Sequence, residues 1–192
     1  MKIRSFLAFD ISDEMRGELS SLITFFSGKI SGIKWMKPEL LHGTLRFFGD
    51  VEENILFGDV SRVVEYELRH QSPLRLSGHG VGVFPNWRYP SIIWAGLQGD
   101  TEPMIGLYSR LEEAFRDFGF KEDKRAFRMH LTLGRAKGNF GGAKDFIRVL
   151  EKMSDAEFGE TVVDSLTLYK SELTRNGPIY TVIRKFAFGP KR

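Results

Sequence analysis

Two copies of the pattern His-x-Thr-Leu are the part of this sequence best suited to chemistry. They occupy residues 42–45 and 130–133, and they contain two of the four histidines of the chain. Side chains alternate between the two faces of a β-strand, so His42, Thr44 and Arg46 should project to one side. By the same parity His130 and Thr132 should project together. Each strand would then present an imidazole and a hydroxyl side by side, with a leucine on the opposite face.

A phosphate group fits this set of side chains. Threonine hydroxyls can donate hydrogen bonds to phosphate oxygens, and imidazoles with a pKa near ~6.5 can exchange protons at neutral pH. If the two strands face each other, one histidine can act as a base while the other acts as an acid. The motifs therefore predict a symmetric polar cleft for a phosphate ester.

Hydrophobic periodicity predicts the elements that must position these motifs. Helices are expected after Ser12, which can N-cap a segment that stops at Gly28, and over residues 53–68, 102–118 and 143–153. Strands are expected over residues 2–10, 33–36, 42–48, 74–84, 91–97, 129–135, 161–170 and 179–188, with Gly49 and Asp50 ending the third. Hairpin-length connections such as residues 176–178 argue against a parallel doubly wound sheet. The predicted class is α+β with mainly antiparallel strands.

The chain length of 192 residues fits one domain, or two small lobes that share a core. The two motifs lie almost half the chain apart, which favours two similar lobes within a single unit over residues 1–192.

Composition narrows the class of protein further. The chain has no cysteine, so disulfides, thiolate nucleophiles and cysteine-based metal sites are excluded. No apolar run approaches the ~20 residues of a membrane span, and we expect a soluble, cytoplasmic protein. Lysine and arginine outnumber aspartate and glutamate by 28 to 25. That slight excess is compatible with a phosphate-bearing partner and equally with an ordinary mixed-charge surface.

These residues resemble the 2H phosphoesterases, and within them the RNA 2′,3′-cyclic phosphodiesterases, long called 2′-5′ RNA ligases. Residues 42–49 (HGTLRFFG) are similar to the first motif of that branch and residues 130–135 (HLTLGR) to the second. Residues 6–10, 82–86 and 173–180 add supporting similarity, so the resemblance spans the whole chain.

The resemblance implies a bilobal, pseudo-twofold fold with two mainly antiparallel sheets flanked by helices around a central cleft. It implies hydrolysis of a terminal 2′,3′-cyclic phosphate on RNA, including tRNA fragments, to a 2′-phosphate, without metal or cofactor. Some members also join a 5′-hydroxyl end in place of water, giving a 2′-5′ linkage without ATP. We expect a monomer with RNA 3′ ends as its partner.

The resemblance also assigns roles to single residues. His42 and His130 would be the catalytic acid and base, and Thr44 and Thr132 would hold the phosphate oxygens. Arg135, by its place in the second motif, would bind the phosphate through its guanidinium, which can donate to two phosphate oxygens at once. Strand parity puts it on the face opposite His130, so this role requires the strand to end or bend at Gly134.

Other residues carry weaker expectations. Arg46 could contact the nucleotide or simply be a solvated strand residue. Gly43 departs from the family, where a bulkier aliphatic residue is common, and it should weaken the strand locally. Three aromatic residues could stack on a base or belong to the core, namely Phe48, Phe84 and Trp87. The two histidines outside the motifs, His70 and His79, are expected to be structural or on the surface.

Three rival interpretations stay open at this point. Histidines 42 and 130 could be ligands of a hydrolytic metal, although neither motif carries the close His or acidic partner of typical zinc sites. The cleft could bind a nucleotide or an RNA end without turnover. Finally, the same fold and mechanism could serve another cyclic phosphate or a small phosphodiester.

Overall fold

The computed structural model describes residues 1–29, 31–121, 126–136, 144–175 and 177–189, and its fold is α+β, as predicted. The strands are β1 (Lys2–Asp10), β2 (Ile33–Trp35), β3 (His42–Glu52), β4 (Leu74–Phe84), β5 (Ile92–Gly99), β6 (Leu131–Ala136), β7 (Glu157–Val163), β8 (Ser165–Thr174) and β9 (Gly177–Ala187). The helices are α1 (Asp13–Ser27), α2 (Glu53–Ile55), α3 (Ser61–Leu68), α4 (Thr101–Asp117) and α5 (Lys144–Glu151). A 3₁₀ turn, η1 (Pro38–Leu40), precedes β3, and a π-helical turn, η2 (Leu56–Val60), joins α2 to α3.

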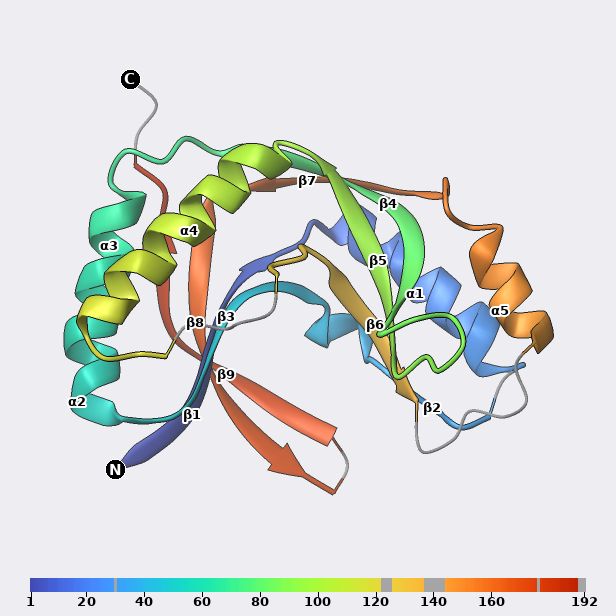
Figure 1. Ribbon diagram of the computed structural model, residues 1–192, viewed down its shortest axis with the longest axis horizontal. Coiled ribbons are helices and arrows are strands. Elements are labelled where there is room, and N and C mark those ends of the chain that lie inside the picture. The colour runs from blue at the N-terminus through green and yellow to red at the C-terminus, as the bar shows by residue number, and fades with distance from the viewer. Residues whose placement is uncertain (30, 122–125, 137–143, 176, 190–192) are drawn as a thin grey trace.

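The described strands form one curled antiparallel sheet rather than the two sheets that we expected (Figure 1). Their order is β7-β4-β5-β6-β3-β1-β8-β9, and β2 attaches to β6. We call β3, β1, β8 and β9 the first half of the sheet, and β7, β4, β5, β6 and β2 the second half. The halves are continuous because β3 pairs with β6 at Gly43 and Leu131.

The single strand predicted over residues 161–170 is wrong, because the strand is interrupted at Asp164. The segment before Asp164, β7, pairs with β4 at one edge of the sheet, whereas β8 pairs with β1 in the first half. Apolar residues occupy positions 162, 166 and 168 on either side of Asp164, and a polar residue within a strand pattern does not by itself reveal that the chain changes partners there. Along the described strands the chain passes between the two halves four times, and this crossing is the last of them.

The strand with the first motif also continues past Gly49 instead of ending there. Gly49 has a φ of 73°, and Ser5 pairs with Gly49 while Phe6 pairs with Phe47. Phe48 is therefore the extra residue of a β-bulge, a place where glycine supplies the left-handed conformation. The bulge lets β3 run on to Glu52.

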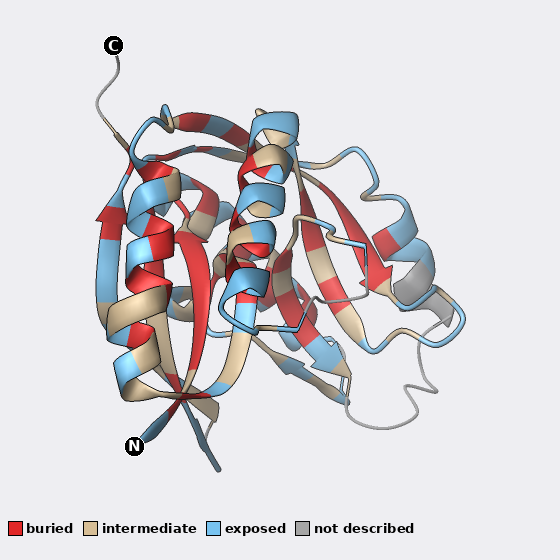
Figure 2. Ribbon diagram, turned by 60° about the vertical axis from the view of Figure 1, so that its left-hand side comes forward, coloured by how far each residue is buried: buried red, intermediate tan, exposed pale blue. Residues whose placement is uncertain are grey.

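Helices cover the face of the sheet that is turned away from the motif side chains. The N-cap of α1 is Ser12, whose hydroxyl accepts a hydrogen bond from the Met15 amide at 3.1 Å, as predicted. The stripe on α1 predicted to be apolar is buried at Met15, Leu19, Ile23 and Phe26. Figure 2 shows the helices with buried residues toward the sheet and exposed residues outward. Within the described residues, every helix is too short or too polar to cross a membrane.

Candidate active site

The second residues of the two H-x-T-L motifs are direct partners in the sheet. Gly43 of β3 lies opposite Leu131 of β6 in an antiparallel pair. One step along both strands from this pair brings His42 opposite Thr132 in one direction and Thr44 opposite His130 in the other. The two motifs are therefore neighbours, and each histidine lies across from the threonine of the other motif.

Both histidines are oriented in the same way by the backbone that precedes them. Nδ1 of His42 lies 2.7 Å from the carbonyl oxygen of Leu40, and Nδ1 of His130 lies 2.6 Å from that of Arg128. A carbonyl oxygen can only accept, so each Nδ1 must carry the hydrogen. In the neutral ring Nε2 is then left as the acceptor. For His42 this atom lies 3.0 Å from the Thr44 hydroxyl.

Aromatic rings hold both imidazoles in place. Phe6 stacks on His42 with ring centroids 4.9 Å apart, and Tyr180 meets His42 edge-on at 5.4 Å. On the other side Phe84 meets His130 edge-on at 5.0 Å. This packing fixes the rings and removes water from one side of each.

Burial lowers the pKa of His42 below its ordinary value, against the Leu40 carbonyl and the charge of Asp10, which act in the opposite direction. The charges of Arg16 and of His130 add to the lowering. Burial lowers the pKa of His130 as well, opposed by the Arg128 carbonyl and assisted by Arg135. Both imidazoles therefore favour the neutral form in the free protein.

A cavity of about 500 Å³ opens beside these residues and is lined by His42, Thr44, Thr132 and Arg135. Its walls also carry cations and aromatic rings, and none of the described lining residues is an aspartate or glutamate. His130 is not a lining residue of this cavity, although its neighbour Leu131 pairs with Gly43 between His42 and Thr44. The additional cationic and aromatic residues of the wall are Arg4, Phe6, Lys34, Trp35, Lys37, Phe47 and Tyr180. Such a wall attracts an anion, and it suits a nucleotide better than an uncharged ligand.

Arg135 reaches the cavity because of a β-bulge in the second motif. Ile93 of β5 pairs with Gly134 and Trp94 pairs with Thr132, which leaves Leu133 as an extra residue. The bulge shifts the alternation of side chains by one, so Leu133 and Gly134 are both buried while Thr132 and Arg135 share the cavity. The bend that the role of Arg135 requires is thus a bulge one residue before Gly134.

The first motif contains the equivalent bulge, and it makes our expectation for Arg46 wrong. Leu7 of β1 pairs with Arg46 and Ala8 pairs with Thr44, so Leu45 is the extra residue. Arg46 consequently points away from the face of His42 and Thr44. It is 8% exposed, forms an ion pair with Glu112 of α4 and donates to the Lys121 carbonyl at 2.6 Å. Arg46 therefore links β3 to α4 through its ion pair with Glu112, and it does not line the cavity.

The aromatic residues considered from the sequence do not line the cavity either. Phe48 packs edge-on against Phe115 and Phe120, Phe84 packs on His130, and Trp87 packs against the hydrophobic core. The rings that do line the cavity are Phe6, Trp35, Phe47 and Tyr180, none of which the sequence singled out for base stacking. His70 and His79 lie outside the cavity lining, as expected.

Sequence reasoning also missed the lysine and arginine residues of the cavity wall. Lys34 is opposite Arg135 in the β2–β6 pair, and Arg4 lies on β1 two residues before Phe6. The only signal in the sequence was that Arg4 and Phe6, two residues apart on one strand, project from the same face. This indicates a place in the cavity only once β1 is known to lie beside β3.

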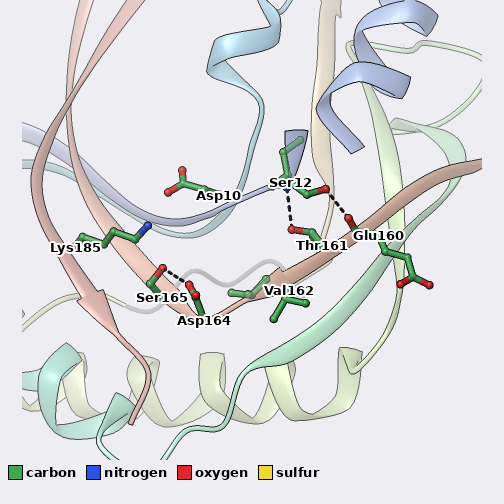
Figure 3. Close-up of a pocket in the computed structure, with 10 residues that line it drawn as sticks. Asp10, Ser12, Glu160, Thr161, Val162, Asp164, Ser165 and Lys185 are labelled. Carbon is green, nitrogen blue, oxygen red and sulfur yellow. Dashed lines mark hydrogen bonds between the residues drawn. The ribbon is translucent and has the colours of Figure 1, made fainter. Parts of the chain in front are cut away.

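A second hollow of about 440 Å³ lies where β7 passes into β8, and it contains none of the motif residues (Figure 3). Asp10, Glu160 and Asp164 contribute carboxylates to its lining, against the single cation of Lys185. This balance disfavours a phosphate ligand. Asp10 also accepts hydrogen bonds from Tyr169 at 2.6 Å and Thr167 at 3.1 Å, and it pairs with His42 in the register of β1 and β3.

Among the residues that the structure describes, no three His, Asp or Glu side chains are grouped so that they could hold a metal ion. A metal centre built on His42 and His130 would thus lack a third protein ligand within the described part of the chain.

Comparison with known proteins agrees with the geometry. The model of the LigT like phosphoesterase family matches residues 9–94 and 98–180. An RNA 2′,3′-cyclic phosphodiesterase of Methanothermobacter thermautotrophicus is 37% identical over 97% of this chain and 99% of its own length. The protein with the same name from Archaeoglobus fulgidus is 36% identical over 96% of this chain and 99% of its own length.

Solved structures show the same fold. A crystal structure of a Thermus thermophilus protein superimposes with a TM-score of 0.82 at 27% identity, covering 98% of this chain and 100% of that one. Escherichia coli LigT complexed with 3′-AMP has a TM-score of 0.76 at 21% identity, covering 98% of this chain and 99% of its own. The paired motifs, the cationic cavity and these similarities lead to one conclusion: the chain belongs to the LigT like phosphoesterase family of 2H phosphoesterases.

Proposed function

We propose that this chain is an RNA 2′,3′-cyclic phosphodiesterase that opens a terminal 2′,3′-cyclic phosphate to a 2′-phosphate. The observation that carries the proposal is the antiparallel pairing of Gly43 with Leu131, which makes the two H-x-T-L motifs neighbours beside a cationic cavity lined by His42, Thr44 and Thr132. The relatives from Methanothermobacter and Archaeoglobus are named RNA 2′,3′-cyclic phosphodiesterases, which supports the proposed class of substrate.

The reaction needs one base and one acid. One of His42 and His130 removes a proton from water through Nε2, and the water oxygen attacks phosphorus. The bond between phosphorus and the 3′ oxygen breaks, and the other histidine gives its proton to that oxygen. The Nδ1 hydrogen bonds to Leu40 and Arg128 support this assignment, because they leave Nε2 of each ring to exchange the proton. In the free protein Nε2 of His42 contacts the Thr44 hydroxyl, which would turn to a phosphate oxygen when the substrate binds.

Binding of the cyclic diester favours protonation of the histidine that acts as the acid. The negative charge of the diester next to two imidazoles favours the charged form of one of them, although burial lowers the pKa of both in the free protein. Binding of the anion therefore supplies the condition under which one ring is protonated and the other is neutral.

Thr44, Thr132 and Arg135 would stabilise the charge that develops on the phosphate oxygens. Their side chains line the cavity, and a guanidinium can contact two oxygens at once. Fixed donors of this kind are effective because they need no reorganisation during the reaction.

Two further points belong to this proposal. The two halves of the sheet, each carrying one motif strand and one equivalent bulge, represent two related lobes of a single unit over residues 1–192. The same site could accept a 5′-hydroxyl RNA end in place of water, which would give a 2′-5′ linkage without ATP.

The test is to incubate the purified protein with an oligoribonucleotide that ends in a 2′,3′-cyclic phosphate, in the presence of a chelator. We expect complete conversion to the 2′-monophosphate, identified by chromatography against authentic 2′- and 3′-phosphate standards. A 3′-monophosphate would mean that the other oxygen leaves. Loss of turnover on chelation, restored by added metal, would favour the metal-dependent alternative, and tight product binding without turnover would favour a binding module.

A further inference from the structure

The two halves of the cavity differ at the position that follows each bulge. Arg135 is three residues after Thr132, and the residue three positions after Thr44 is Phe47. Both side chains line the cavity. Phe47 is 48% exposed, although it is a large apolar residue on a strand. The first half thus offers an aromatic ring where the second half offers a guanidinium.

A cation nevertheless stands at this position in the first half, and it comes from the neighbouring strand. The guanidinium carbon of Arg4 lies 4.5 Å from the centroid of the Phe47 ring, within the range of a cation–π contact. This contact fixes a long side chain over one spot of the cavity wall. It leaves the outer nitrogen atoms of the guanidinium free to bind an anion as a fork.

Arg4 has no acidic partner among the described residues. Its Nε is buried without a hydrogen-bond partner, and Asp50, its register neighbour on β3, makes no ion pair with it within the described residues. A guanidinium fixed in a cavity without carboxylates is a binding group for an anion from outside.

The distance of Arg4 from the catalytic pair suits the neighbouring phosphate of an RNA chain. Arg4 and Phe6 are on the same face of β1, about 7 Å apart along the strand. The ring of Phe6 stacks on His42 at 4.9 Å. Tyr180 meets His42 edge-on at 5.4 Å and lines the same cavity. The cavity therefore holds Arg4 and Arg135 together with His42 and the rings that pack on it.

We propose that Arg4, held against Phe47, binds the phosphodiester on the 5′ side of the terminal nucleotide, so that the site selects RNA chains over 2′,3′-cyclic mononucleotides. This inference rests on the proposed function and adds the residues that recognise the chain. Phe47 acts as a positioning residue for the guanidinium.

The experiment compares kcat/KM for three substrates that share the same reacting group. They are adenosine 2′,3′-cyclic phosphate, the same nucleotide with a 5′-phosphate, and the dinucleotide ApA ending in a 2′,3′-cyclic phosphate. In the unaltered protein we expect the last two to exceed the first by about tenfold or more, the contribution of one charged hydrogen-bonded contact. This preference should decrease as salt is raised, because it is ionic.

Variants then assign the preference to Arg4. Arg4→Gln should bring the ratio between the dinucleotide and the mononucleotide close to one, and Arg4→Lys should retain part of it. Phe47→Leu should lower the ratio by releasing the guanidinium. The matched control is Arg75→Gln, which removes an exposed positive charge from β4 outside the cavity and should leave the ratio unchanged. Circular dichroism and thermal unfolding verify that each variant is folded.

Equal rates on all three substrates in the unaltered protein would overturn the inference while leaving the proposed function intact. So would an unchanged ratio in Arg4→Gln, including the case of an equal loss on all substrates. A preference for the dinucleotide without any effect of the 5′-phosphate would assign recognition to the upstream nucleoside and would also overturn it. No turnover of any of the three substrates would instead contradict the proposed function itself.

Discussion

Gly43 and Leu131 are direct partners across the antiparallel contact between β3 and β6, and each is the second residue of an H-x-T-L motif. This one pair joins the two halves of the sheet and brings the histidines and threonines on either side of it together. The chemistry of the molecule depends on that contact and on the residues around it.

The first prediction concerns the two motif histidines. His42→Ala and His130→Ala should each lower kcat by about 10²- to 10⁴-fold, because each variant lacks one proton-transfer group. Steady-state hydrolysis of an RNA 2′,3′-cyclic phosphate measures the effect. His70→Ala is the matched control, since His70 is exposed and outside the cavity, and it should keep the unaltered rate. A near-normal rate in either motif variant would reject the assignment.

The second prediction concerns pH. The base must lose its proton and the acid must keep its own, so the rate should rise and then fall as pH increases. Burial lowers the pKa of both histidines in the free protein. The bell-shaped pH profile of kcat/KM should therefore have its maximum below pH 6.5, the ordinary histidine pKa being about 6.5.

Bound substrate reverses this displacement. The phosphate anion stabilises the imidazolium and raises its pKa, so the bell for kcat should lie at higher pH than the bell for kcat/KM. Both limbs describe the coupled pair rather than one residue. A flat profile between about pH 5 and 9, or the reverse order of the two bells, would contradict the two-histidine mechanism.

The third prediction concerns Arg135. Arg135→Gln should lower kcat/KM by about 10²- to 10³-fold, the usual loss when one fixed donor to a developing charge is removed. The free energy of unfolding should change little, because the side chain is exposed at the cavity. Arg135→Lys should recover only part of the activity, since lysine cannot contact two oxygens as a fork. Full activity in the lysine variant would show that charge alone is required.

The fourth prediction separates Arg46 from the site. Arg46→Met leaves Glu112 buried without its partner, and it should lower the free energy of unfolding by about 3–5 kcal/mol. The double variant Arg46→Met with Glu112→Leu should recover most of that loss, because no unpaired charge remains. Denaturant unfolding measures both. KM for the cyclic phosphate should be unchanged in the folded double variant, and a large increase would place Arg46 back in substrate binding.

The fifth prediction explains why glycine stands at position 43. A Cβ at this position would lie 2.0 Å from the ring of Phe9, which is fully buried. Gly43→Ala should therefore lower the free energy of unfolding by about 1–3 kcal/mol through overpacking, and it should lower kcat by displacing His42. Phe9→Leu in the same chain provides space and should restore part of both. If the alanine variant alone were as stable as the unaltered protein, the tight contact would be refuted.

Local sequence was sufficient for most of the elements and for the chemical character of the site. The alternation in residues 2–10, the Ser12 cap and the apolar stripe of α1 are local signals, and the structure contains β1 and α1 where they were expected. Thr44 and Thr132 line one cavity with His42, as the two H-x-T-L patterns indicated. These features depend on side-chain alternation within one segment, which the sequence displays directly.

Only the tertiary structure decided which neighbouring side chains enter the cavity. The bulges at Leu45 and Leu133 reverse the alternation, moving Arg46 out and bringing Phe47 and Arg135 in. A bulge arises from the register between two strands, so neither strand reveals it alone. For the same reason the change of partners at Asp164 and the place of Arg4 beside Phe47 could not be predicted. The sequence by itself determined the reacting groups. Pairing between distant strands determined which other side chains line the cavity beside them, because register is a property of the assembled sheet.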